Sequence, residues 1–221
     1  MPVETEGRPV SPWGALFSVF TAPVRTFRSL GDHPPILPPY VAAMVAGLLV
    51  VIAVVQVLPS TLASRGMAGA PASAVAIGAA FVAVPLLLGP WGVGAFDAWI
   101  AGQVGRSLGG GVPFAAYFGM IGYARLPVFV GSLLTAVTSI WVKEFPSSLA
   151  FLVPKGSSTL LWALLNSLRP FDVWYYCLLA VGFSTLHKTR LSRAVWFPLT
   201  LYGLSLTFEV LKVITRGVPG W

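Results

Sequence analysis

The chain has 221 residues, of which 56% are hydrophobic and 10% are charged, and its formal net charge is +7. No charged residue lies between His33 and Arg65, or between Arg65 and Asp97. Such stretches exclude a water-soluble domain, whereas about 20 apolar residues in a helix cross the ~30 Å hydrocarbon core of a bilayer. The composition therefore predicts an all-α fold, a polytopic bundle of transmembrane helices.

Residues 12–31 come before the first long apolar stretch and predict one or two short helices. Thr21 can cap a helix, Pro23 suits a first turn, and Gly31 can end the helix. These helices belong to an expected cytoplasmic N-terminal segment, residues 1–35.

One face of this segment is apolar. Phe20, Val24 and Phe27 recur at helical spacing, whereas Arg25 and Arg28 lie off their face. This pattern predicts an amphipathic helix on the membrane surface, with its rings in the acyl boundary and its guanidinium groups on anionic lipid head groups.

A five-span membrane domain is expected at residues 36–214, followed by a short external tail at residues 215–221. Pro85 and Pro90 should kink the second span unless neighbouring helices cover the freed carbonyl groups. The spans are expected at about Tyr40–Leu58, Ala74–Trp99, Phe114–Ile140, Phe171–His187 and Ala194–Val213.

Two features lie near the start of the fourth span. Within residues 157–168, the apolar stretch Leu160–Leu168 reaches only ~14 Å as a helix, so interfacial and re-entrant placements both remain open. Trp174, Tyr175 and Tyr176 then predict an aromatic belt at the membrane surface.

The basic residues predict the orientation of the bundle. Arg25 and Arg28 directly precede the first span, and Lys188, Arg190 and Arg193 crowd a very short loop. Basic residues close to the ends of spans favour the cytoplasmic side. The sequence thus predicts a plasma-membrane protein with a cytoplasmic N-terminus and an external C-terminus, whose basic residues meet anionic head groups rather than nucleic acid.

Arg125 is the most informative ionisable residue, because it falls inside the third span. An arginine at this depth is costly, so it should face protein or water. Asp97 is a plausible partner, since the second and third spans are antiparallel neighbours. The pair could simply fasten two helices, Arg125 could snorkel to the surface, or the two residues could form a site for a substrate or a lipid phosphate.

Three other features have a structural explanation that outweighs a functional one. Glu209 and Lys212 are three residues apart and can pair along one helix face. His187, at the cytoplasmic boundary, is expected to be an anchor rather than a ligand or pH sensor. The glycine run 109–111 beside Arg106 lacks the Lys-Ser/Thr ending of a P-loop and predicts a flexible turn.

Residues for catalysis are scarce. The chain has one cysteine, Cys177, and two histidines. No Ser-His-Asp set, paired carboxylates or metal-ligand spacing can be recognised in it. We therefore expect no catalytic residue, no cofactor and no metal, and a protein that is not an enzyme.

Several segments, taken in order, resemble the Yip-domain family, the Ypt/Rab-interacting proteins and their bacterial relatives. They are residues 20–27 (FTAPVRTF), 108–114 (LGGGVPF), 122–127 (GYARLP) and 168–174 (LRPFDVW). The positions that carry the resemblance are Pro23, Phe27, Gly110, Tyr123, Pro127, Phe171, Asp172 and Trp174.

The resemblance implies a five-helix integral membrane domain, with Asp172 and Trp174 as structural signatures at the membrane boundary. Eukaryotic relatives are adaptors in vesicle traffic and contact small GTPases through a long N-terminal region. Only about 35 residues precede the first span here, which argues against a GTPase partner. The composition resembles that of bacterial members, some of which are thought to accompany ABC-type exporters.

The leading hypothesis is therefore a non-enzymatic membrane organiser. Its expected partners are the lipid bilayer and other integral membrane proteins, an ABC-type exporter among them, and a homo-oligomer is also open. The alternative is a small transporter, channel or lipid-translocating protein that uses Asp97 and Arg125.

Overall fold

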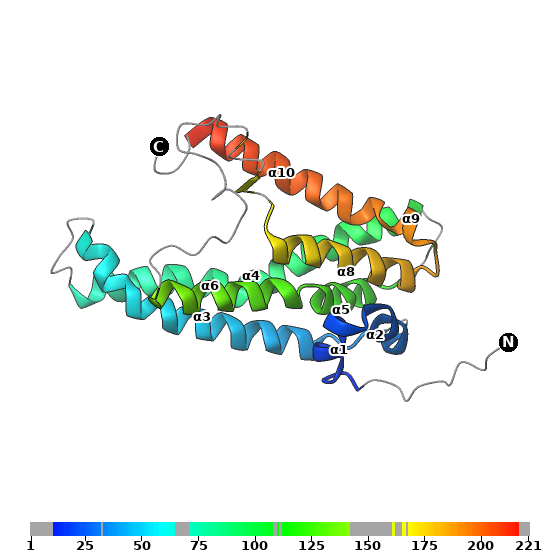
Figure 1. The fold of residues 1–221 in the computed structure, drawn as a ribbon, viewed down its shortest axis with the longest axis horizontal. Helices are drawn as coiled ribbons and strands as arrows, with labels where there is room; N and C mark the ends of the chain where they lie inside the picture. The colour runs from blue at the N-terminus through cyan, green and yellow to red at the C-terminus, as the bar shows by residue number, and fades with distance from the viewer. Residues whose placement is uncertain are drawn as a thin grey trace.

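The computed structural model describes residues 11–31, 33–64, 71–107, 110, 112–141, 161, 165–166 and 168–216. The regular elements in these residues are α-helices (Figure 1). They are α1 (Ala15–Thr21), α2 (Pro23–Leu30), α3 (Leu37–Ser64), α4 (Ala72–Ser107), α5 (Phe114–Ala124), α6 (Leu126–Trp141), α8 (Pro170–Leu186), α9 (Leu191–Ala194) and α10 (Trp196–Arg216).

Four stretches are long and apolar enough to cross a membrane, judged by length and composition. They are Leu37–Gln56, Ala76–Ser107, Phe114–Thr138 and Leu191–Lys212. These correspond to the first, second, third and fifth predicted spans. Helix α8 occupies the place of the fourth, but its 17 residues lie at the lower limit for a span, so the count of five stays a prediction.

The spanning helices form an elongated bundle. Helix α3 packs against α4 and α6, while α8 contacts α2, α5, α6, α9 and α10 (Figure 1). The main core lies around α5 and α8, where Tyr117, Tyr123 and Phe183 are almost completely buried. Large apolar side chains such as Phe81 on α4 and Phe208 on α10 point outward instead, which suits helices surrounded by lipid.

The N-terminal segment contains two helices joined at a proline. Pro23 stands in the first turn of α2, and Gly31 ends that helix with a φ of 67°. The prediction that Thr21 caps α2 is wrong. Thr21 is the last residue of α1, its hydroxyl donates to the carbonyl of Ser18, and the N-cap position of α2 is Ala22, which has no side-chain oxygen to cap with.

Phe20 and Phe27 pack on protein rather than in the acyl boundary predicted for them, whereas Phe17 of α1 is exposed. Phe27 is only 3% exposed, because Gly182 on α8 leaves room for its ring. Phe20 meets Trp174 edge to face, with 5.4 Å between ring centroids. Val24 alone of the three predicted apolar residues is largely exposed. The space left by Gly182 on α8 thus allows the apolar face of α2 to pack against the bundle.

Candidate functional site

The third spanning stretch is interrupted at Arg125. Pro127 has no N–H, and its ring crowds the carbonyl four residues earlier, so the helix cannot continue unchanged through this point. Helix α5 therefore ends at Ala124 and α6 begins at Leu126, with Arg125 between them. Its carbonyl accepts the N–H of Val128 at 2.9 Å, a tight turn that restarts the helix.

Arg125 forms an ion pair with Asp97 on α4. The guanidinium Nη2 lies 2.6 Å from Oδ2 of Asp97, and the hydroxyl of Tyr175 on α8 donates to the same oxygen at 2.6 Å. The guanidinium carbon also lies 5.2 Å from the centroid of the Tyr175 ring. One carboxylate oxygen thus joins α4, the α5–α6 junction and α8.

This cluster is shielded from solvent. Asp97 is 6% exposed and Tyr175 is 5% exposed. Charges in so apolar a setting are tolerated when each is paired and hydrogen-bonded, and the pair supplies both conditions for the carboxylate. Among the residues that the structure describes, the buried Nε of Arg125 has no hydrogen-bond partner.

Tyr175 is the site residue that the sequence analysis missed. It was expected in an aromatic belt with its neighbours, and this is wrong for Tyr175, whose ring points into the core. Tyr175, Leu178, Leu179 and Gly182 are buried together at helical spacing along α8. That periodicity is visible in the sequence and indicates that Tyr175 is buried, unlike Trp174, which is 39% exposed.

The family-type positions mostly lie at contacts between elements. The hydroxyl of Tyr123 donates to the carbonyl of Pro12 at 2.9 Å and ties α5 to the segment that precedes α1. Phe171 covers Gly131 so closely that a Cβ added there would lie 2.6 Å from its ring. Pro127 is fully buried, and Asp172 is half-buried in the first turn of α8.

His187 follows the last residue of α8 and packs against small residues. Its Nε2 lies 2.9 Å from the hydroxyl of Tyr117. A Cβ on Gly105 or Gly110 would lie within 2.8 Å of the imidazole ring, so both glycines allow the close approach. Burial lowers the pKa of His187 below its ordinary value. This arrangement suits a neutral packed anchor.

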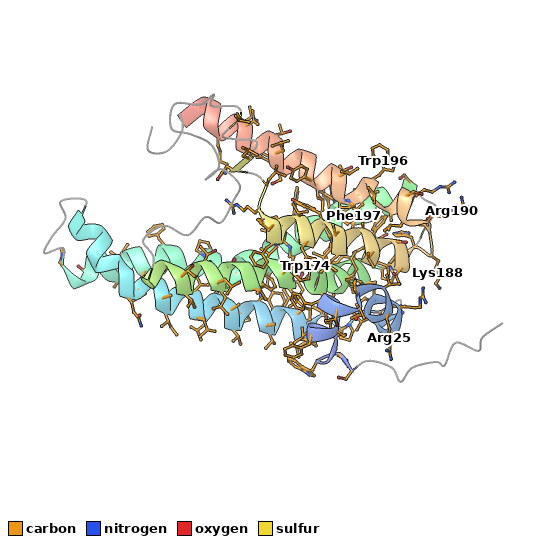
Figure 2. All side chains as sticks on the ribbon, viewed as in Figure 1. Arg25, Trp174, Lys188, Arg190, Trp196 and Phe197 are labelled. Carbon is orange, nitrogen blue, oxygen red and sulfur yellow. The ribbon has the colours of Figure 1, made fainter. Side chains whose placement is uncertain are left out.

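The basic residues expected at the membrane surface gather at one end of the molecule. Arg25 on α2 lies at this end together with Lys188 and Arg190, which follow α8 (Figure 2). Arg28 lies one turn after Arg25, and Arg193 belongs to α9. All five side chains are exposed.

Several predicted features lie outside the described residues. They include most of residues 157–168, two glycines of the run 109–111, and the side chain of Glu209, so its pairing with Lys212 stays a prediction. Gly110 itself is described, and its N–H donates to the carbonyl of Gly105 at 3.2 Å. Among the described residues, no group of three or more His, Cys, Asp or Glu side chains could hold a metal ion.

The arrangement of Asp97, Arg125 and Tyr175 can do two things. It can fasten three parts of the bundle through one carboxylate oxygen, or the buried Nε donor can receive an anion or a water molecule. The fastening role requires only the two contacts of Asp97 that the structure shows.

Comparison with known proteins places the chain in a family. The model of the Yip1 domain matches residues 17–210, which is most of the sequence and extends from α1 to α10. No curated protein matches the chain significantly, and no solved structure does. The matched range includes the basic end, the interrupted third stretch and the cluster around Asp97. The chain belongs to the Yip1 domain family.

Proposed function

We propose that this Yip1 domain protein is a non-enzymatic organiser of other membrane components, either an adaptor for membrane proteins or an accessory subunit of an export transporter in a bacterial plasma membrane. The observation that carries the proposal is the closed cluster of Asp97, Arg125 and Tyr175. The charges of Asp97 and Arg125 are paired with each other, and the cluster joins helices. These buried polar groups therefore stabilise the helix bundle, whose outer surface contacts partners.

Two surfaces support a partner-binding role. The outward face of α4 carries large apolar side chains, including Phe81 and Trp99, that suit lipid or another spanning helix. The basic end formed by α2 and the residues after α8 suits acidic groups on a partner or on lipid.

The test is photo-crosslinking at native expression level. A crosslinking amino acid at Phe81 or Trp99 should capture a recurring membrane-protein partner, while the same residue at Met120, which is buried, should not. The double variant Asp97→Leu/Arg125→Leu should keep the partner, because the cluster only holds the framework. A protein that is repeatedly recovered alone would contradict the proposal.

A transporter or lipid-translocating protein is the second candidate. The interruption of a spanning stretch at Arg125, together with its buried Nε donor, favours it, because broken helices with buried charge mark transport pathways. In proteoliposomes this candidate predicts ion flux or lipid scrambling that the same double variant abolishes. Silence of the wild-type protein in both assays would remove it.

A further inference from the structure

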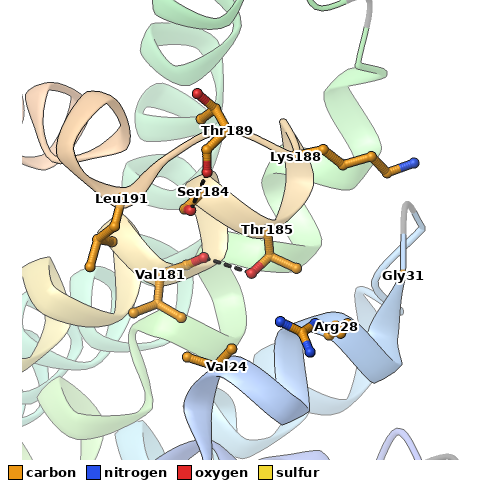
Figure 3. A pocket seen from close by; sticks show the side chains of 9 residues that line it. All are labelled: Val24, Arg28, Gly31, Val181, Ser184, Thr185, Lys188, Thr189 and Leu191. Carbon is orange, nitrogen blue, oxygen red and sulfur yellow. Dashed lines mark hydrogen bonds between the residues drawn. The ribbon is translucent and has the colours of Figure 1, made fainter. Parts of the chain in front are cut away.

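A cavity of about 480 Å³ opens between α2 and the end of α8 (Figure 3). Arg28 on α2 and Lys188 after α8 are the charged side chains among its lining residues. The guanidinium group of Arg28 points toward Thr185 on α8, and the ammonium group of Lys188 extends outward from the rim (Figure 3). The cavity therefore has a positive charge within it and another at its edge.

Lys188, the cation at the rim, has an unusual backbone conformation. The last turn of α8 closes as a Schellman motif, in which the N–H of Lys188 donates to the carbonyl of Thr185 at 3.3 Å and that of Thr189 donates to Ser184 at 3.0 Å. Glycine is the usual residue at the left-handed position of this motif, yet Lys188 occupies it with a φ of 51°. A lysine is thus present where folding alone favours glycine.

An apolar groove of about 400 Å³ lies beside the cavity. It runs between α8 and α10 and is lined by side chains such as Cys177, Pro198 and Leu199. Val181 and Leu191 line both the groove and the cavity. A charged compartment and an apolar compartment therefore meet at two shared residues.

We propose that the cavity and the groove together bind one anionic phospholipid, with its phosphate at Arg28 and Lys188 and an acyl chain between α8 and α10. Charge complementarity selects the occupant, since the cationic compartment suits a phosphate and the adjoining groove suits a hydrocarbon chain. The assignment concerns lipid alone and does not depend on the partner-binding role proposed above.

The phosphate is bound mainly by the two cations. The hydroxyls of Ser184 and Thr185 donate to the carbonyls of Thr189 and Val181, so they are already used within the protein. Cations near the C-terminal end of α8 also interact favourably with the helix dipole and so stabilise the helix. A purely structural role for them would therefore appear as lost stability without any lipid selectivity, and the experiment must measure both.

Native mass spectrometry of the purified full-length protein can count bound lipids. Phosphatidylglycerol should bind in preference to phosphatidylcholine with the same acyl chains. Arg28→Gln and Lys188→Gly should each weaken phosphatidylglycerol binding at least about fivefold, the factor expected for one basic residue near a phosphate. Arg25→Gln is the matched control, because Arg25 lies on the same helix but does not line the cavity.

Lys188→Gly separates binding from folding. Glycine adopts the left-handed conformation without strain, so this variant should melt at least as high as the wild type while it loses lipid. Equal losses of binding in Arg25→Gln and Arg28→Gln would overturn the proposal, because they would show general attraction to a basic surface. Equal binding of the two lipids would also overturn it.

Cys177 is a native reporter for the groove, as the single cysteine of the chain and an exposed one. Phosphatidylglycerol should slow its alkylation by N-ethylmaleimide, and the Arg28→Gln variant should need more lipid for the same protection. Glycerol phosphate, which has no acyl chain, should leave the alkylation rate unchanged. Binding of glycerol phosphate as tight as that of the lipid would assign the cavity to a soluble phosphate and overturn the lipid assignment.

Discussion

Oδ2 of Asp97 accepts hydrogen bonds from Arg125 and Tyr175, so three elements depend on one atom. The partnership of Asp97 and Arg125 could be inferred from the sequence, because adjacent antiparallel spans place residues near their shared end side by side. Tyr175 could not be chosen as readily, since an aromatic residue at the start of a span is typical of both a surface belt and a core contact.

Removal of one member of the ion pair should be more harmful than removal of both. Arg125→Leu or Asp97→Leu leaves an uncompensated buried charge, which costs about 3–5 kcal/mol, whereas replacement of both by apolar residues is often near neutral. Thermal denaturation in detergent should therefore show two unstable single variants and a double variant that recovers most of the loss. An Arg125→Leu variant as stable as the wild type would contradict the structural role of the pair.

Acidification should weaken the packing of His187. Because burial lowers its pKa in the folded protein, the unfolded chain takes up a proton at a higher pH than the folded chain does. The contribution of His187 to the stability of the fold is therefore expected to be fully present above pH 6.5, the ordinary pKa, and to decrease as the pH drops below it. The charged and titratable residues near His187 include Tyr117, which contacts the ring, and also His33, Arg106 and Lys188.

Melting temperatures between pH 8 and pH 5 measure this effect. The variant His187→Gln should lose the part of the pH dependence below pH 6.5. His33→Gln, which replaces the other histidine of the chain, should retain it. An unchanged pH profile in His187→Gln would show that other groups govern acid stability.

At the scale of elements, hydropathy located the helices well and their ends poorly. The predicted second span ended at Trp99, whereas α4 continues to Ser107, because polar residues in a helix that leaves the bilayer still satisfy their backbone hydrogen bonds. The docking of α1 and α2 was not predictable in the same way. The sequence pattern of an amphipathic helix is the same whether lipid or protein covers its apolar face. Gly182, which lies against Phe27, is also distant in sequence.

Close approach of α3 and α4 should make Gly47 intolerant of a side chain. A Cβ at Gly47 would lie 2.9 Å from the carbonyl oxygen of Leu86, so Gly47→Ala must separate the two backbones. Such overpacking typically costs about 1–3 kcal/mol. Gly203→Ala in α10 is the control, because nothing lies within 4 Å of its Cβ position and alanine favours a helix.

Thermal denaturation of both variants in one detergent gives the comparison. Gly47→Ala should melt lower than the wild type, and Gly203→Ala should melt as high or higher. If the two behaved alike, contact between α3 and α4 would not depend on the small residue.

At the scale of the whole molecule, the gathering of basic residues predicts sidedness. In a Cys177→Ser background, cysteines at Arg106 and Arg190 should be shielded from an impermeant thiol reagent in intact cells. Cysteines at Lys155 and Arg169 should react. The opposite pattern would reverse the orientation and move the proposed lipid site to the other leaflet.

The helices of this bundle differ greatly in length, and α8 is the shortest of those predicted to span the membrane. As helices, the 36 residues of α4 extend ~54 Å and the 17 residues of α8 extend only ~25 Å, against a hydrocarbon thickness of ~30 Å. Such hydrophobic mismatch makes the surrounding bilayer thin, or makes the long helix tilt, at a cost that grows with every ångström. A protein that is tall on one side and short on the other deforms the two sides differently, and it should therefore concentrate where a membrane is already thin or curved.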